Sequence, residues 1–231
     1  MLFDLRSKSR RNTVRVVYIL LALLMVSGLL LVGVGTGNNS GGILNAFSNG
    51  SSNSGQNSAI EQQTKAALKS TQKHPDSPAA WKSLVQARWT AAGNGTNYDT
   101  ATDTYTKSGK QQLNLGVTAW VKYLSLANQK PDLGTSLLAG DIYQALGQWA
   151  NAGGAWQYVI QTQAAGSSDT IRGYECLALN SFAAKQTSKG ELAAAAATKL
   201  LPKVDQTEWT TTVTSAKSSA TDAQQYVADD C

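Results

Sequence analysis

The chain has 231 residues, of which 42% are hydrophobic and only 15% charged, and its net charge is +5. The first fifteen residues hold five bases and one acid, a net charge of +4, so the remainder carries only +1. A nucleic-acid-binding domain, which needs a basic face, is therefore disfavoured. One histidine and two cysteines exclude most metal sites, any catalytic triad that needs a second imidazole, and a disulfide-rich scaffold.

The N-terminal region has the pattern of a membrane anchor. Residues 16–35 read VVYILLALLMVSGLLLVGVG, without a charge. As a helix this run would be roughly 30 Å long, the thickness of a hydrocarbon core, so we predict a transmembrane helix over residues 16–36. Bases crowd its N-terminal side, and the positive-inside rule then predicts that the basic tail, residues 1–15, is cytoplasmic and the rest of the chain extracytoplasmic.

A cleaved signal peptide is the alternative interpretation of the same residues. The basic start fits both, but the apolar run is longer than the about 7–15 residues of a signal peptide. No cleavage site of the Ala-x-Ala kind closes it. The sequence favours the anchor, and the alternative leaves a secreted protein with its N-terminus removed.

A flexible linker and an all-α domain are predicted after the anchor. Residues 37–57 are nearly all Gly, Ser and Asn, a composition that buries too little surface to order itself. From residue 58 onward the apolar spacing is helical, and no segment alternates convincingly with period two. We therefore predict one all-α domain over residues 58–231.

Helix boundaries within this domain follow from capping residues and prolines. Ser58 and Glu61 form a capping box that opens a first helix, which Pro75 ends, and Pro78 opens the next. The Thr-rich residues 94–110 predict an irregular insertion or a short helix. Further helices are expected over residues 111–128, 133–145, 149–162, 171–185, 191–201 and, as one final helix, 205–228.

One segment of the domain resembles a tetratricopeptide repeat, a helical hairpin with small and aromatic residues at set positions. Counted from Leu133, the small and aromatic residues of that pattern are Gly140 at position 8, Tyr143 at 11, Gly147 at 15, Ala152 at 20 and Trp156 at 24. Small residues let two antiparallel helices approach closely, and the aromatic rings fill the space beside them. The alternative is an irregular helical bundle with one repeat-like pair.

The resemblance extends more weakly to the rest of the domain. It implies repeat-like units at residues 78–131, with an insertion between the two helices, at 133–164 and at 171–202, closed by a capping helix over 205–228. The layout is similar to that of bacterial single-pass tetratricopeptide-repeat proteins at the outer face of the inner membrane.

A partner-binding groove is what the resemblance implies about function. In such repeats the first helix of each hairpin lines a concave groove, which would here suit an extended segment with apolar anchors better than an acidic tail. The alternative for Trp89 and Phe182 is packing between repeats. The groove positions carry over to Lys82, Gln86, Trp89, Leu137, Asp141, Gln144, Arg172, Glu175, Leu179 and Phe182.

No catalytic, cofactor or metal site is predicted from the remaining residues. His74 has no sequence partner and reads as a helix-end residue. Cys176 reads as a small buried residue, and its pairing with Cys231 in an oxidising compartment is left open by the spacing. We expect a non-enzymatic scaffold or client-holding module with protein or peptide partners, without cofactor, metal or nucleic acid. The alternative is a secreted helical protein that binds a ligand or the cell wall.

Overall fold

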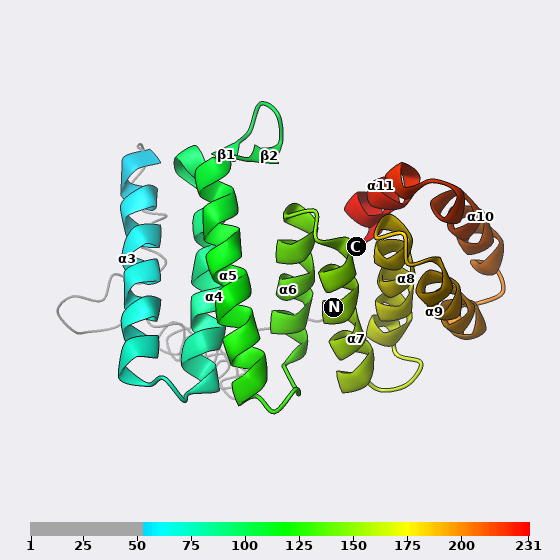
Figure 1. Cartoon of the computed structure of the whole chain (residues 1–231), viewed down its shortest axis with the longest axis horizontal. Helices are drawn as coiled ribbons and strands as arrows, with labels where there is room; N and C mark the ends of the chain where they lie inside the picture. Colours follow the sequence, from blue (N-terminus) through cyan, green and yellow to red (C-terminus); the bar gives the residue numbers. More distant parts are fainter. Residues whose placement is uncertain (1–52) are drawn as a thin grey trace, which may run out of the picture. The chain divides into compact units, whose positions relative to one another are not determined.

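The computed structural model describes residues 53–231, which fold almost entirely into helices joined by short turns (Figure 1). The predicted all-α fold is confirmed over this part of the chain. The predicted tail 1–15, the membrane span 16–36 and most of the linker 37–57 lie outside the described residues. Between residues 53 and 231, no helix combines the length and the apolar character that crossing a membrane requires.

The helices follow one another as antiparallel neighbours, and α4 packs on α5, α6 on α7, and α8 on α9 (Figure 1). Helix α7 also packs on α8, and the C-terminal helix α11 packs back on α8. The elements are α3 (Asn53–Lys73), α4 (Pro78–Ala92), the 3-10 turn η1 (Gly95–Asn97), β1 (Tyr98–Asp99), β2 (Thr104–Tyr105), α5 (Lys107–Leu126), α6 (Leu133–Ala145), α7 (Trp149–Thr162), α8 (Ser168–Ala183), α9 (Thr187–Leu200), α10 (Gln206–Ser218) and α11 (Ala220–Asp230).

Side-chain caps set where most of these helices begin. The side-chain oxygens of Ser77, Thr106, Asp132 and Ser167 each accept a hydrogen bond from the backbone N–H three residues further on. Each cap satisfies one of the N–H groups that the first turn leaves without a partner. Pro78 follows the first cap, where its missing N–H does no harm, so the predicted start of α4 is confirmed.

Several predicted boundaries are wrong, and α5 and α9 each begin four residues earlier than expected, at Lys107 and Thr187. Helix α3 begins at Asn53, so Ser58 lies in its second turn rather than at its cap. The insertion contains the short helical turn η1, but it also forms an antiparallel pair in which Tyr98 lies opposite Tyr105, which was not predicted. The single final helix is two, because Ser219 is extended and its hydroxyl accepts the Asp222 N–H at 3.2 Å, which caps a new helix, α11.

The close approach predicted between α6 and α7 is confirmed. A Cβ added to Gly140 would stand 3.2 Å from the indole Nε1 of Trp156, and Trp156 is only 1% exposed. Ala152 is fully buried as well. The turn between the two helices uses Gly147 at φ +67°, a conformation that favours glycine.

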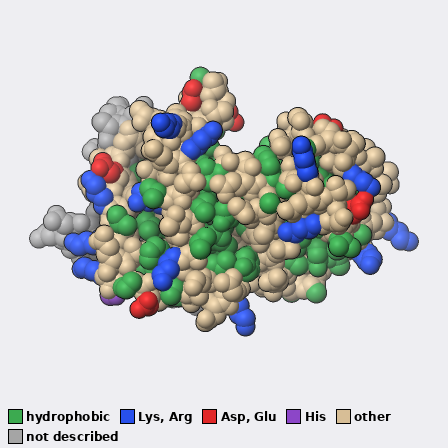
Figure 2. Space-filling view, viewed as in Figure 1, with side chains coloured by type: hydrophobic (Ala, Val, Ile, Leu, Met, Phe, Trp, Pro, Cys, Tyr) green, Lys and Arg blue, Asp and Glu red, His purple; other side chains and the backbone are tan. Residues whose placement is uncertain are grey.

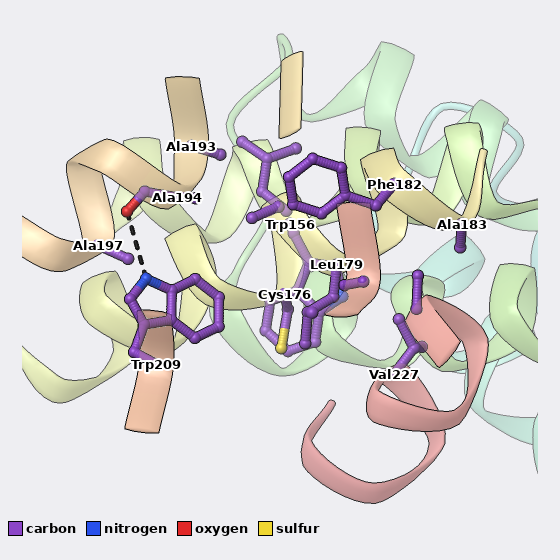
Figure 3. Close-up of a cluster of buried hydrophobic side chains, with 14 of the residues drawn as sticks. Trp156, Cys176, Leu179, Phe182, Ala183, Ala193, Ala194, Ala197, Trp209 and Val227 are labelled. Atoms are coloured by element: carbon purple, nitrogen blue, oxygen red, sulfur yellow. Dashed lines mark hydrogen bonds between the residues drawn. The ribbon is translucent and has the colours of Figure 1, made fainter. Parts of the chain in front are cut away.

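A cluster of buried side chains joins α7 to the C-terminal helices (Figure 3). Trp209 of α10 lies across α9, and its indole N–H donates to the Ala194 carbonyl at 3.3 Å. Cys176 of α8 forms a disulfide with Cys231, with Cα atoms 5.6 Å apart. This bond answers the question that the sequence left open, and it fastens the end of α11 to α8.

Candidate functional site

The ten predicted groove residues lie on three helices, α4, α6 and α8. Two of them are not on a surface. Leu179 is 1% exposed and Phe182 is 4% exposed, and both belong to the buried cluster. The ring of Phe182 faces α9, where a Cβ on Gly190 would meet it at 2.5 Å.

The prediction that Leu179 and Phe182 face a groove is therefore wrong. The reason is the C-terminal end of the chain: α11 packs against α8, and α7 and α9 flank the same helix. Every residue from Cys176 to Ala183 is buried, as expected of a helix enclosed on all sides. The alternative of internal packing holds for Phe182.

The short hairpin brings two aromatic rings to the end of α4. The rings of Trp89 and Tyr105 have centroids 6.0 Å apart, and Tyr98 meets Tyr105 edge-on at 5.0 Å. Such tilted and edge-on contacts are the preferred geometries of aromatic pairs. Burial, aided by the charges of Asp141 and Asp103, raises the pKa of Tyr105 to about 12.

Asp141 of α6 interacts electrostatically with Tyr105 of this aromatic cluster and with Arg172 of α8. Burial raises the pKa of its carboxyl to about 6, and the positive charge of Arg172 only partly opposes this. No hydrogen bond and no salt bridge to this carboxylate occurs among residues 53–231. A half-buried carboxylate without a hydrogen-bond donor is costly, because no donor compensates the solvation that it has lost.

A second group without a partner lies one turn further along α6. The side-chain Nε2 of Gln144 is buried and has no hydrogen-bond acceptor within the described part of the chain. The Asp141 carboxylate, an acceptor, and the Gln144 amide, a donor, therefore lie three residues apart on one helix without hydrogen-bond partners. Buried polar groups rarely lack a partner, and each such group requires an explanation.

Arg172 and Glu175 extend the polar surface onto α8. The guanidinium of Arg172 lies 5.8 Å from the centre of the Trp156 ring, and it donates to the Cys231 carbonyl at 3.4 Å. Burial and the nearby Asp230 raise the pKa of Glu175, against the opposing effect of Arg172. The space-filling view shows the surface hollowed between the hairpin and the C-terminal helices, above α6 and α7 (Figure 2).

The other predicted residues have structural partners or are solvent-exposed. Lys82 forms a salt bridge with Asp132 at 3.2 Å, Leu137 packs against the buried cluster, and Gln86 is exposed. Burial acts to raise the pKa of Asp132, but hydrogen bonds from Tyr123, Thr135 and Lys82 outweigh it and lower that pKa to about 2. Asp132 therefore caps the start of α6 and is already occupied by partners within the chain.

Sequence reasoning missed the aromatic contribution of the hairpin to this site. Strands of two residues have no detectable alternation, so the only signal was the pair of tyrosines, Tyr98 and Tyr105, within a Thr-rich insertion. The described residues contain no group of three or more His, Cys, Asp or Glu side chains placed to hold a metal ion.

No family model, curated protein or solved structure matches the chain. The likeness to tetratricopeptide repeats therefore rests on the residue pattern of the sequence.

Proposed function

We propose that this protein is a membrane-anchored, non-enzymatic interaction module on the extracytoplasmic side of the membrane. Its helical hairpins form a tetratricopeptide-repeat-like array that holds an extended segment of a partner protein against α6 and α8. The observation that carries the proposal is the pair of unmatched groups on α6, the Asp141 carboxylate and the Gln144 amide.

An extended peptide suits these groups because its backbone offers what they lack. Each peptide unit has one N–H for the Asp141 carboxylate and one C=O for the Gln144 amide. Arg172 adds a donor on α8, and the rings of Trp89 and Tyr105 provide an apolar surface for side chains at the hairpin end. Groups already desolvated before binding lose little further hydration when the partner docks.

The disulfide supports the proposed compartment. Bonds such as Cys176–Cys231 persist in oxidising environments and are rare in a reducing cytosol. The basic tail before the predicted span favours the same orientation. The absence of enzymatic activity is proposed from the sequence, which has a single histidine and no recognised catalytic motif.

In-cell photo-crosslinking tests the groove. A photoreactive residue is placed at Gln86, Gln144 or Arg172, with controls at Val121 and Leu192, which are 55% and 75% exposed on α5 and α9. We expect one shared partner from the three groove positions, none from the controls, and loss of capture when Asp141→Arg is added. Capture of the same partner at the control positions, or capture that survives Asp141→Arg, contradicts the groove.

A mass measurement tests the anchor separately. We expect the intact mass of the protein in the membrane fraction to show that it keeps residues 1–36. A soluble form that lacks the first residues would favour the secreted alternative.

A further inference from the structure

A second site lies apart from the groove, in a cleft of about 440 Å³ between α3, α4, η1 and the start of α5. This volume falls within the range of small-molecule sites, about 300–1,000 Å³. Helix α3 leaves this space because its buried contacts are the small side chains of Thr64, Ala67 and Thr71. Ile60, Leu68 and Ala91 give the cleft an apolar wall.

Arg88 lines this cleft without a negatively charged partner. Its Nη1 donates to Gln112 Oε1 at 2.7 Å, and its buried Nε has no acceptor among residues 53–231. None of the salt bridges formed by the described residues involves it. Burial lowers its pKa, yet a guanidinium stays charged at physiological pH. A partly buried charge without a counterion is unfavourable unless a ligand supplies one.

The cleft carries one surplus positive charge. Its other charged residues, Lys65 and Glu61, neutralise each other in a salt bridge of 2.6 Å. Gln112 fixes the guanidinium in place, so an incoming anion meets an oriented donor group rather than a mobile side chain. An apolar wall beside a single positive charge matches a molecule with an apolar body and one negative group.

We propose that this cleft binds a small organic acid, whose carboxylate pairs with Arg88 and whose apolar body packs against Ile60 and Leu68. The proposal is independent of the groove on α6 and α8. The competing occupant is an acidic side chain of a protein partner. If that were the occupant, free acids would bind to the cleft no better than their neutral amides, so the test separates a small acid from a protein partner.

Ligand-observed saturation-transfer NMR on the full chain in detergent, with empty micelles as the blank, tests the cleft. The probes are benzoate, 3-phenylpropionate and indole-3-acetate, each against its primary amide. We expect at least one acid to bind at least tenfold more tightly than its amide, and Arg88→Gln to weaken that acid at least tenfold. Lys122→Gln, at an exposed position on α5, is the matched control and should change nothing.

A second variant keeps the test decisive if Arg88→Gln does not fold. Leu68→Trp enlarges a side chain at the rim, which is 38% exposed, and should block the acid without touching the guanidinium. Any of three results would overturn the proposal. These are that none of the three acids binds, that acid and amide bind equally well, or that binding survives both variants. Crosslinking from Gln144 should be unaffected by either variant, so failure here leaves the groove untouched.

Discussion

At the scale of single residues, Asp141 would link the stability of the domain to its proposed function. An ordinary aspartate has a pKa of 3.8, and burial raises that of Asp141 to about 6. Between these values the folded state keeps a proton that the unfolded state has lost, so stability falls as pH rises from about 4 to about 6. Above pH 6 the folded protein holds a charged carboxylate that the positive charge of Arg172 compensates only in part.

Asp141→Asn should therefore stabilise the protein while it weakens binding. We expect a gain of roughly 1–3 kcal/mol in the free energy of unfolding at pH 7.5, which nearly vanishes at pH 4. Urea unfolding followed by circular dichroism at both pH values measures it. A gain of equal size at both values would mean that the carboxylate is already compensated, and the argument for the groove would lose its basis.

The sequence places Asp141 among the candidate groove positions, but it does not predict the protonation state of its carboxyl. Asp141 was selected because the repeat pattern assigns its position to the groove. The pKa of its carboxyl depends on burial and on Arg172 of α8, which comes from a distant part of the chain. The prediction for Leu179 and Phe182 is wrong for a similar reason, since α7, α9 and α11 together enclose this part of α8.

At the scale of helices, close packing depends on a few glycines. Gly190 of α9 faces the buried ring of Phe182, and a Cβ there would lie within 2.5–2.9 Å of three ring atoms. Gly154, in the middle of α7, has nothing within 4 Å of such a Cβ. The two positions therefore form a matched pair for one substitution.

Gly190→Ala should destabilise the protein and Gly154→Ala should stabilise it. Both gain helix propensity, about 0.5–1 kcal/mol, but overpacking against Phe182 costs about 1–3 kcal/mol. We expect a net loss of about 1–2 kcal/mol for the first variant and a gain of about 0.5–1 kcal/mol for the second, both by thermal unfolding. If both variants gained equally, α8 and α9 would not pack as closely as described.

Helix boundaries were predictable where local signals were strong. The predicted bounds of α6 and α7 agree with the structure, because a cap at Asp132 and a left-handed Gly147 mark them. The break at Ser219 was missed because the apolar stripe continues through it, from Trp209 and Ala216 into Ala223 and Val227. Both helices bury that stripe, so periodicity alone could not reveal a change of direction.

At the scale of the whole domain, a disulfide as well as helix packing holds the C-terminal helices against α8. Cys176 and Cys231 are 55 residues apart in sequence, and their bond restricts the unfolded chain. A chain-entropy treatment gives about 4 kcal/mol for a loop of this length. Which residues meet was not predictable, because the fold of α10 and α11 decides it.

Cys231→Ser should lower the free energy of unfolding by about 2–4 kcal/mol. Denaturant unfolding of the wild type with and without dithiothreitol should give a similar difference, and the variant should not respond to the reductant. A wild type whose stability ignores reductant would show that the bond does not contribute.

The disulfide also makes the domain mechanically unequal along its length. A pulling force on a tethered chain is carried across the Cys176–Cys231 bond, so the 55 residues that it closes add nothing to the extension. At roughly 3.3–3.6 Å per residue, close to 190 Å of chain is withheld from stretching. Helix α3 has no such protection and is held by small side chains. Under a pulling force the domain would unfold from α3 first. The segment that the disulfide closes, from α8 to α11, would not extend.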